Sequence, residues 1–130
     1  MHNTVKNLLE IDNNIKDHLN KLNINRKSKI IAVSKTFKID KILPLIEHGH
    51  IDFGENKVQE ASEKWMDIKK NNLHIKLHMV GKLQTNKVKY AVKIFDYIHS
   101  VDSAKLAKKI ADEQNKINKK IKVFCQINIG

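Results

Sequence analysis

Apolar residues recur along this chain with two alternating periods. Residues 4 to 22 place apolar side chains three and four positions apart, which predicts an amphipathic helix. The run "KIIAVSK" (29–35) is short and continuously apolar, a pattern typical of a strand covered on both faces. Residues 39–48 predict a second helix, in which Pro44 either introduces a kink or marks the first turn, and Gly49 ends it.

The alternation then continues to residue 130. Further strands are predicted at 51–54, 74–81, 95–101 and 120–130. Further helices are predicted over 55–71, over 83–93 and after an N-terminal cap at Asp102 or Ser103. The last helix is expected to bury four apolar residues, namely Leu106, Ala107, Ile110 and Ala111. Strands and helices in this order are typical of βαβ units around a parallel sheet.

Two parallel architectures fit this order, an open doubly wound sheet and a (β/α)₈ barrel. No strand is followed by G-x-G-x-x-G or by G-x-x-x-x-G-K-[ST]. The missing glycine-rich loops argue against the common nucleotide-binding open sheets.

Composition restricts the class of protein further. The 130 residues suffice for one domain with a core. The chain contains no run of 18 apolar residues, so no membrane span is predicted. The polar start "MHNTVKNLLEIDNN" does not look like an export signal, and the single cysteine, Cys125, is expected to be a buried thiol. These features favour a cytoplasmic protein.

The net charge of +11 raises the alternative of a nucleic-acid-binding protein. Arg26 is the only arginine, although arginine is favoured for bidentate recognition of bases and phosphates. The lysines are spread along the chain rather than concentrated in one block. Nucleic-acid binding is therefore the weaker hypothesis, and salt-dependent binding would discriminate it.

Polar residues gather where the predicted strands end. Lys35, "GENKVQE", "HMVGKLQTNK", "HSVDS" and "NIG" each follow a strand, whereas the segments before the strands are generic. In a parallel barrel these ends form one rim, on which active sites are built. A lysine after a strand is commonly just solvated, but this asymmetry assigns Lys35 to a site.

Alternation along the first strand refines the prediction for Lys35. Ile31, Val33 and Lys35 point to one side of the strand, so that Lys35 would cap a barrel interior lined by the other two. Partial desolvation disfavours the charged form of an amine. A neutral lysine amine is the nucleophile that forms Schiff bases with aldehydes.

Five motifs in order, "AVSKTF", "FGENKVQEA", "HMVGKLQTNKVK", "IHSVDS" and "QINIG", resemble the YggS/PROSC family of pyridoxal 5′-phosphate (PLP) homeostasis proteins. These proteins are relatives of the N-terminal barrel domain of alanine racemase. The resemblance implies a fold-type III PLP barrel, here a partial (β/α)₈ TIM barrel of about five βα units preceded by a helix. The implied domains are an N-terminal helix packed on the barrel (1–27) and the first part of the barrel (28–130).

The resemblance also implies a set of cofactor-binding residues. Lys35 would hold PLP as a Schiff base, and Asn56 and His78 would lie near the cofactor. Gly81, Gln84 and Asn86 match a loop over the same mouth. Simpler roles stay open for some of them. Asn56 is alternatively a helix cap, His78 a hydrogen-bonded residue without a ligand, and Gln84 and Asn86 residues of a helix start.

The chain departs from the family pattern at Leu77, Met79 and Lys82, which puts the shape of the pocket wall in doubt. It is also shorter than family members, so it resembles their N-terminal portion. The residues that bind the phosphate and the pyridine nitrogen are expected beyond residue 130.

The function implied by the resemblance is PLP homeostasis without efficient turnover, with PLP-dependent enzymes that receive the cofactor as partners. The full-length form is expected to be a monomer. The alternative is a fold-type III PLP-dependent enzyme such as an amino-acid racemase.

Overall fold

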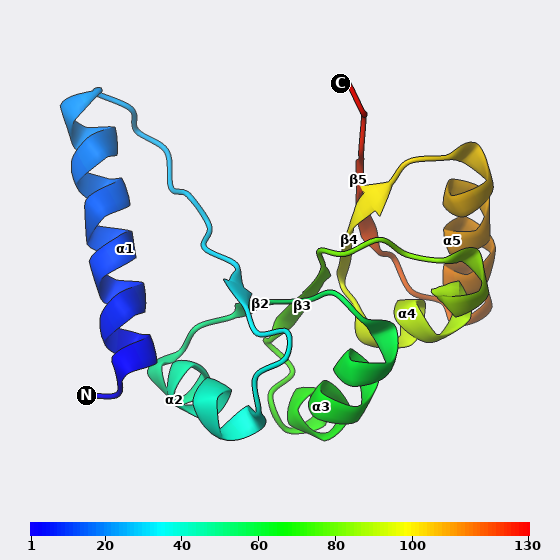
Figure 1. Ribbon diagram of the computed structural model, residues 1–130, viewed down its shortest axis with the longest axis horizontal. Helices are drawn as coiled ribbons and strands as arrows, with labels where there is room; N and C mark the ends of the chain where they lie inside the picture. Colours follow the sequence, from blue (N-terminus) through cyan, green and yellow to red (C-terminus); the bar gives the residue numbers. More distant parts are fainter.

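A five-stranded parallel sheet forms the centre of the computed structural model, which describes residues 1–130 (Figure 1). The strands are β1 (Ala32–Val33), β2 (Asp52–Glu55), β3 (Lys76–Met79), β4 (Tyr97–Val101) and β5 (Lys122–Cys125). They lie side by side in chain order, β1-β2-β3-β4-β5. A doubly wound sheet reverses its order at a switch point. The unbroken order therefore supports the predicted partial barrel.

The helices are α1 (Asn3–Lys21), α2 (Ile39–His48), α3 (Val58–Asn71), α4 (Val88–Ile94) and α5 (Ala104–Lys116). A single 3₁₀ turn, η1 (Thr85–Lys87), precedes α4. Helices α2 to α5 lie on the outer side of the curved sheet, and α1 stands beside α2 (Figure 1). None of these helices is both long and apolar enough to cross a membrane.

Local signals explain several helix ends. Gly49 ends α2 with a φ of 101°, a left-handed conformation that a residue with a Cβ rarely adopts. Pro44 lies inside α2, where it lacks the N–H that would donate to the Asp40 carbonyl. Ser103 caps α5 by accepting a hydrogen bond from the Leu106 amide at 3.1 Å, as one of the two predicted caps.

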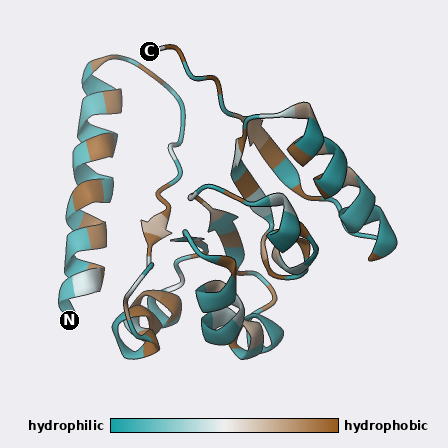
Figure 2. Ribbon diagram, turned by 45° about the vertical axis from the view of Figure 1, so that its right-hand side comes forward, coloured by the Kyte–Doolittle hydropathy of each residue, from teal (hydrophilic) through white to brown (hydrophobic).

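The hydrophobic core lies between the outer face of the sheet and helices α2 to α5. Its largest fully buried side chains are Trp65, Phe53, Phe95, Ile75 and Leu77. Figure 2 shows brown, hydrophobic stretches on the strands and mostly teal surfaces on the outer helices. Alternate strand residues face either this core or the concave inner face.

Several details of the sequence prediction are wrong. Cys125 is exposed rather than buried, because β5 pairs only with β4 and all four of its residues are exposed. Ala107 and Ala111 are exposed, while Glu113 is buried on α5 instead. The second strand-to-helix loop is longer than predicted, because α3 begins at Val58.

Candidate functional site

The carboxyl ends of the strands meet along one edge of the sheet, as predicted. Val33 pairs with Gly54, Gly54 with His78, and His78 with Tyr97. Pairing continues beyond β1, where the Ser34 amide donates to the Gly54 carbonyl at 2.8 Å. The loops that follow β1, β2 and β3 therefore lie next to one another.

Lys35 follows β1 at this edge and is exposed. Its Nζ forms no salt bridge and no hydrogen bond within the chain. The expected partial desolvation is not observed, because Val33 below it is itself 48% exposed. Ile31 and Val33 nevertheless point to the same side of the strand, as predicted. A Cβ on Gly54 would lie 3.2 Å from Ile31 Cγ2 and 3.5 Å from Val33 Cγ2, so both residues line the concave face.

The residue before Lys35 is held by a buried group of side chains, which we call the Ser34 cluster (Ser34, Glu55, Lys64 and Trp65). Glu55 is fully buried and accepts hydrogen bonds from the Ser34 hydroxyl and from Trp65 Nε1. Lys64 Nζ lies 3.1 Å from Glu55 Oε2 and donates to the Ser34 carbonyl at 2.7 Å. The cluster thereby joins the end of β1 to β2 and α3.

Burial affects the protonation of the carboxyl group inside this cluster. Burial raises the pKa of the Glu55 carboxyl above its ordinary value, although hydrogen bonds from Ser34, Trp65 and Lys64 oppose the effect. A buried carboxylate needs a paired cation and hydrogen-bond donors. Lys64, Ser34 and Trp65 provide them, so the geometry of the Ser34 backbone depends on an ion pair beneath it.

The residue after Lys35 has a strained backbone. Thr36 has a φ of 65°, a left-handed conformation that is a genuine outlier for a β-branched residue. Its amide donates to Glu60 Oε1 at 2.8 Å, and this hydrogen bond lowers the pKa of Glu60. Such strain costs about 1–3 kcal/mol and clusters at functional sites. Lys35 therefore lies between two anchored residues.

The loops after β2 and β3 touch at Asn56 and Gly81. A Cβ on Gly81 would lie 2.7 Å from the Asn56 carbonyl oxygen, so only glycine allows this approach. The Gly81 carbonyl accepts from Ser100 Oγ at 2.7 Å, which ties the contact to β4. Asn56 Oδ1 is buried without a hydrogen-bond partner. Asn56 is not the cap of α3, because Lys57 occupies that position.

A cavity of about 300 Å³ opens beside this contact. Asn56 and Gln84 both line it, together with Lys57, Lys82 and Lys87. Asn86 is exposed within η1 and does not line the cavity, and neither does Lys35. The structure therefore joins Asn56, Gly81 and Gln84 closely and leaves Lys35 and Asn86 at the periphery of this group.

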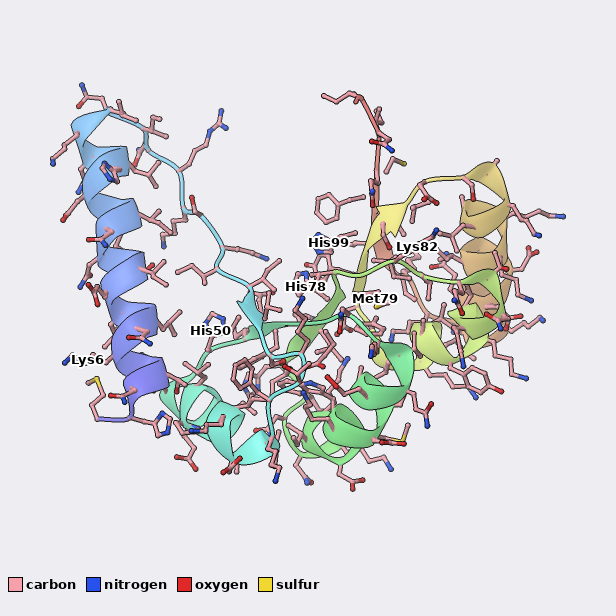
Figure 3. All side chains as sticks on the ribbon, viewed as in Figure 1. Lys6, His50, His78, Met79, Lys82 and His99 are labelled. Atoms are coloured by element: carbon pink, nitrogen blue, oxygen red, sulfur yellow. The ribbon has the colours of Figure 1, made fainter.

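His78 lies lower on the concave face and is buried (Figure 3). Its Nε2 is 2.9 Å from Asp52 Oδ1, and its Nδ1 is 2.9 Å from His99 Nε2. Both ring nitrogens thus have partners inside the chain, which matches the simpler role of a hydrogen-bonded residue. No sequence motif pointed to Asp52, whereas the motif "IHSVDS" contains His99 at an inward-facing position.

Comparison with known proteins identifies the family. The family model described as "Alanine racemase, N-terminal domain" matches residues 7–130. The chain therefore belongs to the family of alanine racemase N-terminal domains.

Relatives with curated names are similar over part of their length. A pyridoxal phosphate homeostasis protein of Pasteurella multocida is 33% identical over 126 residues, covering 96% of this chain and 54% of the relative. A pyridoxal phosphate homeostasis protein of Buchnera aphidicola is 41% identical over 105 residues, covering 81% of this chain and 45% of the relative. The chain spans about half the length of the curated relatives it matches.

Among solved structures, PipY of Synechococcus elongatus with PLP bound is similar with a TM-score of 0.75 and 34% identity, covering 88% of this chain and 54% of PipY. PipY without PLP is similar with a TM-score of 0.73 and 37% identity, covering 77% of this chain and 46% of PipY. These likenesses agree with the partial barrel seen here.

Proposed function

We propose that this chain belongs to a protein of PLP homeostasis and that Lys35 holds the cofactor as a Schiff base. The observation that carries the proposal is the placement of Lys35: an amine without a partner, at the end of β1, between the anchored residues Ser34 and Thr36. The solved structure of a family relative with PLP bound supports the choice of cofactor.

The chain's other residues fit such a cofactor. The buried Asn56 Oδ1 lacks a partner and can accept a hydrogen bond from a ligand. Gly81 lets its loop close onto Asn56, and Gln84 lines the same cavity. Asn86 would contact a ligand only at the edge of this mouth. We assign His78 to positioning, because both of its nitrogens are engaged.

PLP, when bound, supplies an aldehyde for the lysine amine and an electron sink. The residues described here bind and orient it, and a homeostasis protein would pass it to PLP-dependent enzymes. Such enzymes that lack their cofactor are the partners this function requires.

Borohydride reduction tests the proposal. PLP is added to the chain, the adduct is reduced, and labelled peptides are mapped. Lys35 should carry several times more label than any other lysine, and Lys35→Ala should lose this label. Lys38→Ala is the matched control, because Lys38 is also exposed and lies three residues away. Even labelling of the surface lysines, or unchanged labelling in Lys35→Ala, would sink the proposal.

A further inference from the structure

Three polar side chains cross the concave face of the sheet in one line, and the proposed function uses only one of them. We call them the histidine row: Asp52 on β2, His78 on β3 and His99 on β4. Asp52 Oδ1 is 2.9 Å from His78 Nε2, and His78 Nδ1 is 2.9 Å from His99 Nε2. Figure 3 labels the two imidazoles next to each other at the centre of the molecule.

Aromatic rings hold the two imidazoles in place. The Tyr97 ring stacks on His78 at a centroid distance of 4.2 Å and an interplanar angle of 6°. The Phe124 ring stacks on His99 at 4.5 Å and 27°. Since rotation of either imidazole would break a hydrogen bond and a stacking contact, both rings are oriented by the fold.

The order of donors and acceptors follows when both imidazoles are neutral. The Asp52 carboxylate can only accept, so His78 carries its proton on Nε2. His78 Nδ1 then accepts from His99 Nε2–H, and the lone pair of His99 is left on Nδ1. His99 is half-buried, so this lone pair lies at the less enclosed end of the histidine row.

We propose that the histidine row is a proton relay. A proton enters at His99 Nδ1, and the proton on His99 Nε2 moves to His78 Nδ1. His78 becomes an imidazolium ion beside the Asp52 carboxylate, and His99 is again neutral, with its proton now on Nδ1. One proton is taken up and the charge moves by one residue, from the half-buried end to the buried ion pair.

The position of the relay suggests what would deliver the proton. Lys35 follows β1 at the carboxyl edge of the sheet, and His99 lies in β4, two residues beyond the Tyr97 that pairs with His78. If the proposed function holds, the donor is a hydroxyl or ammonium group of a ligand at this mouth. Asp52 at the opposite end lines a cavity of about 310 Å³ beside α1.

Other titratable groups lie near the row on several elements. Asp12, His48 and His50 line the cavity beside Asp52. Lys76 shares the inner face of β3 with His78, by alternation along the strand. Tyr97 stacks on His78 from β4, and Lys122 Nζ of β5 lies 5.7 Å from the Tyr97 ring. Asp52 is the only carboxylate bonded to the row. A proton in the row is therefore stabilised mainly by Asp52.

Long-range ¹H–¹⁵N correlation of the histidine rings tests the relay in the 130-residue chain without any cofactor. At pH 8 both His78 and His99 should be protonated on Nε2. On acidification the ¹⁵N shifts of both rings should change with one shared midpoint. When the titration is complete, the added charge should be on His78. Asp52→Asn should lower this midpoint, because it removes the opposite charge. His74, an exposed residue of the loop before β3, is the internal control.

Two results would overturn the relay: His99 protonated on Nδ1 at pH 8, or independent midpoints for the two imidazoles. The wild-type spectrum alone decides these, so a poorly folded Asp52→Asn variant does not weaken the test. Since PLP is absent, failure here is separate from failure of the labelling experiment on Lys35.

Discussion

Lys64 Nζ donates to the carbonyl oxygen of Ser34 at 2.7 Å, so a side chain of α3 fixes the backbone next to Lys35. The same ammonium group neutralises the fully buried Glu55 carboxylate. The ion pair therefore helps to position Lys35, because it fixes the backbone of the preceding residue, Ser34.

Replacing Lys64 by methionine should lower the free energy of unfolding by about 3–5 kcal/mol, since it leaves a buried carboxylate unpaired. The double variant Lys64→Met with Glu55→Leu should recover part of the loss. Lys70→Met, at an exposed position on the same helix, should stay within about 0.5 kcal/mol of wild type. Urea unfolding at low salt measures all three.

The loss in Lys64→Met should also depend on pH. Burial raises the folded-state pKa of Glu55, so protonation stabilises the folded state at low pH and this contribution is lost as pH rises through that pKa. The deficit of Lys64→Met should therefore be larger at pH 7 than at pH 5. An equal deficit at both values would show that Glu55 is not the residue left unpaired.

Thr36→Gly should stabilise the fold by about 1 kcal/mol, because relief of the strained φ of 65° outweighs the extra flexibility of glycine in the unfolded chain. It should also reduce the preference of PLP labelling for Lys35, since the turn after Lys35 is loosened. Asn23→Gly is the matched control: Asn23 has a φ of 53°, which asparagine tolerates. Thermal unfolding and peptide mapping follow the two effects. Destabilisation of Thr36→Gly would mean that the Thr36 hydroxyl matters more than the strain.

His99 should make stability depend on pH in the opposite sense to Glu55. Burial and the charge of His78 lower the pKa of His99. The contribution of His99 to the free energy of unfolding is therefore fully present above the pKa of His99 in the unfolded chain. It is lost as the pH falls from that value towards the lower pKa of the folded state. The stability difference between wild type and His99→Gln should thus decrease between pH 7 and pH 5. His74→Gln, at an exposed site, should show no such trend in the same unfolding series.

Local signals predicted the fold well. The sequence predicts a helix over residues 39–48, and α2 has those bounds because apolar spacing and Gly49 are contained within the segment itself. Parallel order and the shared edge also follow from the alternation of strands and helices.

The polar contacts of the site were not predictable in this way. Ser34 and Glu55 are 21 residues apart, and Asp52 and His78 are 26 residues apart, so each contact depends on strand register. The exposure of Lys35 and Cys125 likewise depends on what covers a strand, which periodicity within the strand does not report.

The open side of β5 should make the 130-residue chain self-associate. β5 pairs with β4 alone, and Val123, Phe124 and Ile127 are 45%, 51% and 79% exposed. An unpaired apolar edge strand is a template for pairing with another chain. The net charge of +11 opposes this at low ionic strength, and added salt screens the repulsion.

Sedimentation velocity at low and moderate salt should therefore show a monomer that converts to larger species as salt rises. Val123→Lys places a charge on the edge strand and should reduce the association several-fold. Leu73→Lys adds the same charge at an 85% exposed residue of the loop before β3, and it should leave the association nearly unchanged. Equal effects of the two variants would attribute the change to net charge rather than to β5. A monomer insensitive to salt would mean that the edge of β5 is protected in solution.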